Sequence, residues 1–149
     1  MITHEIGFTG EVSPVHKWRV LTLLLVSAGL SVAGCGAGGD RESAADAVAV
    51  RLLTAVGARD GVTACSALAP ETASEVSRNA GKPCPEAVLE EDLPAPGQVT
   101  GTDVYGQWAQ VRLSDDTVFL AVFPDGWKVV AAGCTSRGER PYLCAVQGS

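Results

Sequence analysis

The spacing of apolar residues changes once along the chain, and this change constrains the fold more than any other feature. From residue 42 to residue 90 the apolar side chains recur mostly every three or four residues, as on one face of a helix. After the proline-rich break at 94–97 they alternate, as in strands. Helices that precede the strands, rather than separate them, are typical of an α+β domain. We therefore expect N-terminal helices packed on a curved antiparallel sheet.

The pattern also predicts the individual elements. Helices are expected at 42–58, 61–68 and 70–78, with one more turn at 86–90. Asp60 is placed to cap the second helix, and Pro70 suits the first turn of the third. Strands are expected at 99–105, 107–113, 117–123, 127–132 and 142–146, with a loop at 135–141 before the last strand.

Residues 16–35 carry the pattern of an export signal. Lys17 and Arg19 form a short basic patch, and an uncharged, largely apolar run follows from residue 20 to residue 33. A basic segment, an apolar run and small residues at its exit are typical of a secretory signal peptide. The positive charges stay on the cytoplasmic side while the apolar run enters the translocation channel.

Val32-Ala33-Gly34-Cys35 resembles the lipobox of bacterial lipoproteins, in which an aliphatic residue and two small residues precede a cysteine. The resemblance implies cleavage after Gly34 and a diacylglyceryl group, with acyl chains such as palmitate, on the Cys35 thiol. The protein is then expected on the extracytoplasmic face of the cell membrane, held by its N-terminal lipid. The expected organisation is a signal peptide at 1–34, a flexible glycine-rich tether at 35–41 and one disulfide-stabilised domain at 42–149.

Two other interpretations of this segment stay open. The uncharged stretch 20–39 has the roughly 20 residues that an uncleaved membrane anchor needs, although glycines dilute its second half. Ordinary signal-peptidase cleavage would instead leave Cys35 unmodified. Glu5 and Glu11 are unusual ahead of an export signal, and one explanation is that residues 1–11 precede the natural start.

The five cysteines divide into one and four. Lipidation of Cys35 accounts for the odd thiol, and outside the cytoplasm the other four are expected to form two disulfides. Three pairings are possible. We favour Cys65–Cys84 and Cys134–Cys144, because each pair lies within one local unit of the chain. The spacings match no zinc module, so we expect no metal.

Charge and histidine content argue against several function classes. The net charge of -6 and the pI of about 4.8 argue against a nucleic-acid partner, because phosphate binding needs a basic face. Both histidines, His4 and His16, precede the expected cleavage site. A mature chain without histidine discounts Ser-His-Asp and Cys-His catalysis, and we expect no cofactor.

The element order and the cysteine positions resemble those of small actinobacterial lipoproteins of unknown function with the NTF2-like cone fold. The matching features are Cys65 in the second helix, Cys84 after the third, the strand that starts at Trp127, and the segment from Cys134 to Cys144. The resemblance covers roughly residues 42–148 and implies a sheet that curls around its helices. A cystatin-like sheet that wraps one helix is the nearest alternative.

The same resemblance implies candidate site residues. NTF2-like enzymes use Asp, Tyr or His inside the cone, and Asp103, Tyr105 and Trp108 of the first hairpin are placed to line such a cavity. Arg137 and Arg140, between the last two cysteines, are a second candidate contact. We favour a lipid-anchored binding domain for an unidentified protein or small molecule over a histidine-free enzyme that uses Asp and Tyr.

The two tryptophans that follow Cys35 are expected on opposite faces of the sheet. Trp127 follows a turn and is expected to be buried between sheet and helices. Trp108 alternates with Ala109, which belongs to the apolar side, so it is expected to be exposed near Tyr105 on a possible partner surface. A pocket filled by side chains would favour such a surface role over chemistry.

Overall fold

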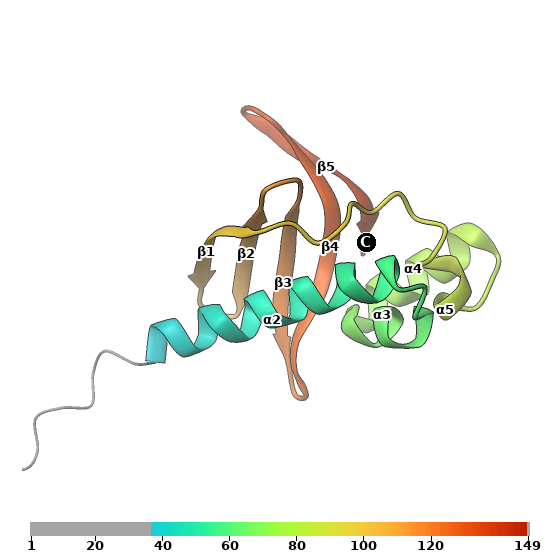
Figure 1. The fold of residues 1–149 in the computed structure, drawn as a ribbon, viewed down its shortest axis with the longest axis horizontal. Helices are drawn as coiled ribbons and strands as arrows, with labels where there is room; N and C mark the ends of the chain where they lie inside the picture. Colours follow the sequence, from blue (N-terminus) through green and yellow to red (C-terminus); the bar gives the residue numbers. More distant parts are fainter. Residues whose placement is uncertain (1–36, 149) are drawn as a thin grey trace, which may run out of the picture. The chain divides into compact units, whose positions relative to one another are not determined.

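The computed structural model describes residues 37–148, which form an α+β domain (Figure 1). Within these residues four helices come first, and five antiparallel strands follow as one curved sheet. The longest helix lies across one face of the sheet, and the three shorter helices gather beyond its C-terminal end (Figure 1). The expected fold class is therefore confirmed as α+β with helices before a curved antiparallel sheet.

The helices are α2 (Ala37–Gly57), α3 (Gly61–Ala67), α4 (Pro70–Ala80) and α5 (Cys84–Ala87). Asp60 caps α3 as expected, because its carboxylate accepts a 3.0 Å hydrogen bond from the Thr63 amide, and hydrogen bonding by Thr63 lowers the pKa of Asp60. Pro70 starts α4, and Gly81 ends it in the left-handed conformation. The turn expected at 86–90 lies earlier, because Pro85 favours a first helical turn.

Helix α2 begins earlier than expected, so residues 37–41 form its first turn and not a flexible tether. The two glycines in this turn are poor helix formers, which is why the pattern placed the start later. Arg41 holds the turn in place: its Nη2 donates to the carbonyl of Gly106, and its guanidinium lies 5.5 Å from the centre of the Trp127 ring. Both partners lie far along the chain, so no local pattern reveals them.

The strands are β1 (Val99–Tyr105), β2 (Trp108–Leu113), β3 (Thr117–Phe123), β4 (Gly126–Arg137) and β5 (Arg140–Gln147). They pair in chain order, each antiparallel to the one before. Tyr105 pairs with Trp108, and Ala109 pairs with both Val104 and Leu120. This register lines up the alternating apolar residues of the first three strands on one face.

The loop expected at 135–141 is instead the end of a long hairpin. Strand β4 continues to Arg137, β5 starts at Arg140, and only Gly138 and Glu139 form the turn. Gly138 has a φ of 69°, which glycine adopts without strain. Both strands are exposed here, so they lack the apolar alternation by which a strand is predicted from sequence.

The core lies between α2 and one face of the sheet, which we call the covered face. Its buried side chains on the sheet include Ala109, Val111, Val118, Leu120, Trp127 and Val129. The matching side chains on α2 are Ala45, Ala49, Leu52 and Leu53. We call the opposite side of β1–β3 the open face, because no helix of the described residues packs on it.

Candidate functional site

The open face brings three of the sequence candidates together. Asp103, Tyr105 and Trp108 point to the same side, because Asp103 pairs with Gln110 and Tyr105 pairs with Trp108 across β1 and β2. Tyr105 is 65% exposed and Trp108 is 59% exposed, whereas Trp127 on the covered face is 8% exposed. The expected placement of the two tryptophans is therefore confirmed.

The same alternation corrects the expectation that Asp103, Tyr105 and Trp108 line a cavity between sheet and helices. Their neighbours along the strands, such as Val104 and Ala109, face α2, so the candidates face away from it. Within the described residues the covered face carries packed apolar side chains, Trp127 among them, that form one buried cluster with the helices. An Asp/Tyr pocket inside a cone is not formed by these residues.

An ion pair lies on the open face. Arg112 Nη1 donates to Asp103 Oδ2, and the two side chains are 41% and 39% exposed. The hydrogen bond with Asp103 and the charge of that carboxylate raise the pKa of Arg112, and Tyr105 and Tyr142 contribute less. Both groups still reach water, so a ligand can exchange hydrogen bonds with them without opening the fold.

Tyr142 of β5 also reaches the open face. Its hydroxyl accepts a 3.1 Å hydrogen bond from Gln110 Nε2, and its ring meets that of Phe119 edge to face at 5.0 Å. Sequence reasoning missed Tyr142 and Phe119 as site residues. Gln110 could have been placed on the open face from sequence, because it has the same parity as Trp108 along β2. Tyr142 of β5 could not have been placed in this way, because β4 shifts register and Gly133 has a φ of 65°.

Arg137 and Arg140, the second candidate contact, face each other across the tip of the β4–β5 hairpin. Both are exposed, and Arg137 Nε donates a 3.0 Å hydrogen bond to the carbonyl of Pro141. They lie beyond Tyr142 on the hairpin, so they form a separate basic tip and not part of the ion pair on the open face.

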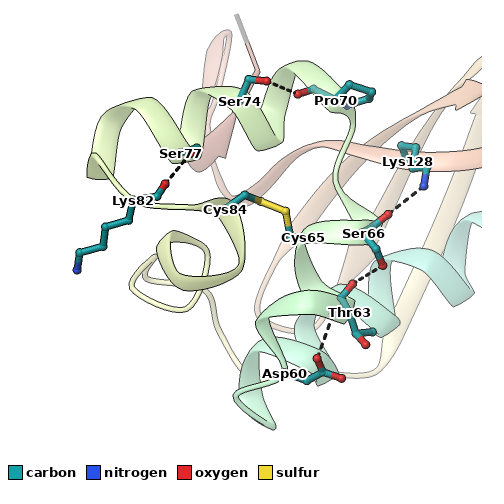
Figure 2. Close-up of a disulfide and its surroundings, with 10 residues drawn as sticks. All are labelled: Asp60, Thr63, Cys65, Ser66, Pro70, Ser74, Ser77, Lys82, Cys84 and Lys128. Atoms are coloured by element: carbon teal, nitrogen blue, oxygen red, sulfur yellow. Dashed lines mark hydrogen bonds between the residues drawn. A yellow bond between two sulfur atoms is a disulfide. The ribbon is translucent and has the colours of Figure 1, made fainter.

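The structure contains both disulfide pairings that the sequence favoured. Cys65 of α3 is bonded to Cys84 at the start of α5, and Cys134 of β4 is bonded to Cys144 of β5. Figure 2 shows the first disulfide joining two helical segments, with the Lys128 ammonium of β4 donating a 2.9 Å hydrogen bond to the carbonyl of Ser66. Each half of the domain therefore carries one covalent crosslink.

Asp116 is a buried carboxylate whose role the sequence did not indicate. It is 7% exposed, and its two oxygens accept backbone hydrogen bonds from Gly133 at 3.1 Å and from Cys134 at 2.8 Å. Burial raises the pKa of Asp116, and these hydrogen bonds oppose the rise. Both acceptor oxygens face the backbone of β4, so the residue fixes the strand where it bends.

Two open clefts lie beside β5. One, of about 290 Å³, lies between α4 and the end of β5, and Glu91 contributes to its wall. The other, of about 540 Å³, lies beside the Cys134–Cys144 disulfide, and Asp92 and Asp115 contribute to its wall. Burial raises the pKa of Glu91. Neither cleft includes the open-face candidates.

Gly34 and Cys35, the expected cleavage and lipidation residues, lie outside the described residues. No helix between residues 37 and 148 is long and apolar enough to cross a membrane. In the same range, no group of three or more His, Cys, Asp or Glu side chains is arranged to hold a metal ion. Comparisons with protein-family models, curated proteins and solved structures found no match for the chain.

Proposed function

We propose that the protein is an exported lipoprotein, acylated at Cys35 and held on the extracytoplasmic face of the cell membrane. The observation that carries this proposal is the order of features before the domain. The basic pair Lys17 and Arg19, the apolar run and Val32-Ala33-Gly34-Cys35 follow one another as in bacterial lipoproteins.

The two disulfides support export. Disulfides persist in oxidising compartments and are rare in the cytoplasm, where thiols are kept reduced. Here all four cysteines of the described residues are paired. The two cysteines of the first bond are 19 residues apart in sequence, and those of the second are 10 residues apart. The cysteine that remains is Cys35, which the proposed lipid would occupy.

We further propose that the domain binds a protein or small molecule through its open face and is not an enzyme. The Asp103–Arg112 pair, Gln110 and the rings of Phe119 and Tyr142 offer charge, hydrogen bonds and apolar area on a surface that packs on no helix of the described residues. The filled covered face supports a surface role over an internal catalytic pocket. The acidic chain does not favour nucleic acid.

We also propose that the domain has the NTF2-like fold. The support is the order of elements: helices first, then a curved antiparallel meander with Cys65 and Cys84 in the helical part. An experimental structure that places the sheet and helices in the cystatin-like arrangement, with one helix wrapped by the strands, would overturn this part.

Intact-mass analysis of protein purified from the membrane fraction tests the anchoring. We expect an N-terminus at Cys35 that carries a diacylglyceryl mass. The Cys35→Ser variant should keep its signal segment and carry no lipid. A wild-type chain cleaved elsewhere, or one with an unmodified Cys35, contradicts the proposal.

Photocrosslinking in the producing cells tests the binding face. A photoreactive phenylalanine at Gln110 should give a discrete adduct, because this position lies on the open face beside Tyr142. The same group at Val62, which is 71% exposed on α3, serves as the control. Adducts that are equal at the two positions, or absent at Gln110, would contradict binding through the open face.

A further inference from the structure

The point at which the chain enters the domain lies close to Cys35. Only Gly36 separates Cys35 from Ala37, the first residue of α2. Two trans peptide links span at most about 8 Å between Cα atoms, whatever conformation they adopt. If Cys35 carries a lipid, the first turn of α2 must therefore lie at the membrane surface, and the inference below rests on that proposed acylation.

The β1–β2 turn lies beside this first turn of α2. Arg41 Nη2 donates to the carbonyl of Gly106 in the turn, and the guanidinium lies over Trp127, at the start of β4. Figure 1 shows the C-terminal end of β1 next to the beginning of α2. The end of the sheet that carries this turn is thus the end nearest to the lipid.

Two exposed aromatic side chains lie together at this end of the sheet. Tyr105 and Trp108 flank the turn, pair with each other across β1 and β2, and are 65% and 59% exposed. We call Tyr105 and Trp108 the aromatic rim. Tryptophan and tyrosine have an apolar body and a polar tip, which suits them to the headgroup level of a bilayer.

We propose that the aromatic rim lies in the headgroup region of the same membrane that holds the Cys35 lipid. The lipid keeps this end of the domain at the surface, so the rim meets phospholipid at a high effective concentration. Contact at a second point would also restrict how the domain rotates about its anchor. Helix α2, about 30 Å long, then carries α3 away from the point of attachment.

Tryptophan quenching by brominated lipid tests the proposal. The full chain is produced with its export segment, purified in acylated form and placed in phosphatidylethanolamine–phosphatidylglycerol vesicles. Only Trp108 and Trp127 follow Cys35 in the sequence. With acyl chains brominated near the headgroup, we expect wild-type emission to fall. We expect no fall in Trp108→Phe, whose remaining Trp127 is buried.

A matched control places the tryptophan at the other end of α2. Val62 is exposed on α3, beyond the C-terminus of α2. In the Trp108→Phe background, Val62→Trp should restore exposed tryptophan emission that brominated lipid does not quench. Quenching equal to that of the wild type at this position would show that the domain has no preferred orientation, and would overturn the proposal.

The other outcomes separate the rim from the anchor. Intact mass of the same preparation reports whether Cys35 is acylated, and an unmodified Cys35 overturns both proposals. An acylated chain whose Trp108 is not quenched by brominated lipid overturns the rim alone. If Trp108 is in addition shielded from aqueous acrylamide, another protein surface covers it, and the membrane is the wrong occupant.

Discussion

The covered and open faces of the sheet share the backbone of β1–β3 but differ in what their side chains do. On the covered face, Val111, Val118 and Leu120 are fully buried against the helical layer. At alternate positions of β1 and β2, Tyr105 and Trp108 point to the other face and are mostly exposed. Buried and exposed side chains therefore alternate along the strands, so the exposed positions of the open face can change with little cost to the fold.

The tryptophan pair gives the largest expected difference between the faces. Trp127→Ala should lower the free energy of unfolding by about 3–5 kcal/mol, as truncation of a buried large aromatic does. Trp108→Ala should change it by no more than about 0.5 kcal/mol, because the side chain is mostly exposed. Equilibrium urea denaturation of both variants measures this. Equal losses, or a larger loss at Trp108, would mean that the faces are reversed.

The adjacent aspartates sharpen the comparison at the end of the covered face. Asp116→Ala should cost about 1–3 kcal/mol, because the amides of Gly133 and Cys134 lose their acceptor in a buried position. Asp115 is exposed, and Asp115→Ala should change stability by at most about 0.5 kcal/mol. Thermal unfolding of the two variants at one pH compares them. A loss at Asp115 that matches the loss at Asp116 would show that the turn, and not the buried carboxylate, matters.

The two tyrosines of the open face test how much structure that face holds. Tyr142→Phe removes the hydrogen bond from Gln110 but keeps the ring against Phe119, so it should cost about 0.5–1.5 kcal/mol. Tyr105 is mostly exposed, and Tyr105→Phe should cost less than about 0.5 kcal/mol. Denaturant midpoints of the two variants are compared with the wild type. If Tyr105→Phe lowers the stability as much as Tyr142→Phe does, the two tyrosines do not differ in their structural role, and this prediction is wrong.

The pH dependence of stability gives the smallest effect. Burial raises the pKa of Asp116 in the folded chain, so the folded state holds this proton more tightly than the unfolded state. The contribution of Asp116 is therefore most favourable below its unfolded pKa of about 3.9, and it falls as the pH rises through the folded pKa. Above that value it is constant. Unfolding curves of wild type and Asp116→Asn should diverge in this window, and parallel pH profiles would contradict the raised pKa.

Features set by short stretches of chain were predictable from sequence. The change of period at 94–97 predicted helices before strands, and the alternation around Trp108 separated the two faces of β2. Both disulfide pairings followed from proximity along the chain. Asp60 at its helix start and the turn before Trp127 were equally local signals.

Features set by distant contacts were not predictable. The first turn of α2 depends on Arg41, whose partners belong to the sheet. The β4–β5 hairpin is exposed on both sides, so its residues lack the apolar alternation by which strands are recognised. Tyr142 joins the open face only after β4 has shifted register and turned at Gly133. Each of these depends on residues that meet only in the folded chain.

The meander order of the sheet has a kinetic consequence. Because β1 to β5 are neighbours in chain order, each strand can pair with the one before it through a short turn, and little loop entropy is lost at each step. If the chain is exported N-terminus first, as we propose, it can pair β1, β2 and β3 before β5 has left the translocation channel. The bond between Cys65 and Cys84 can close early as well. The bond between Cys134 and Cys144 would then be the last covalent step of folding.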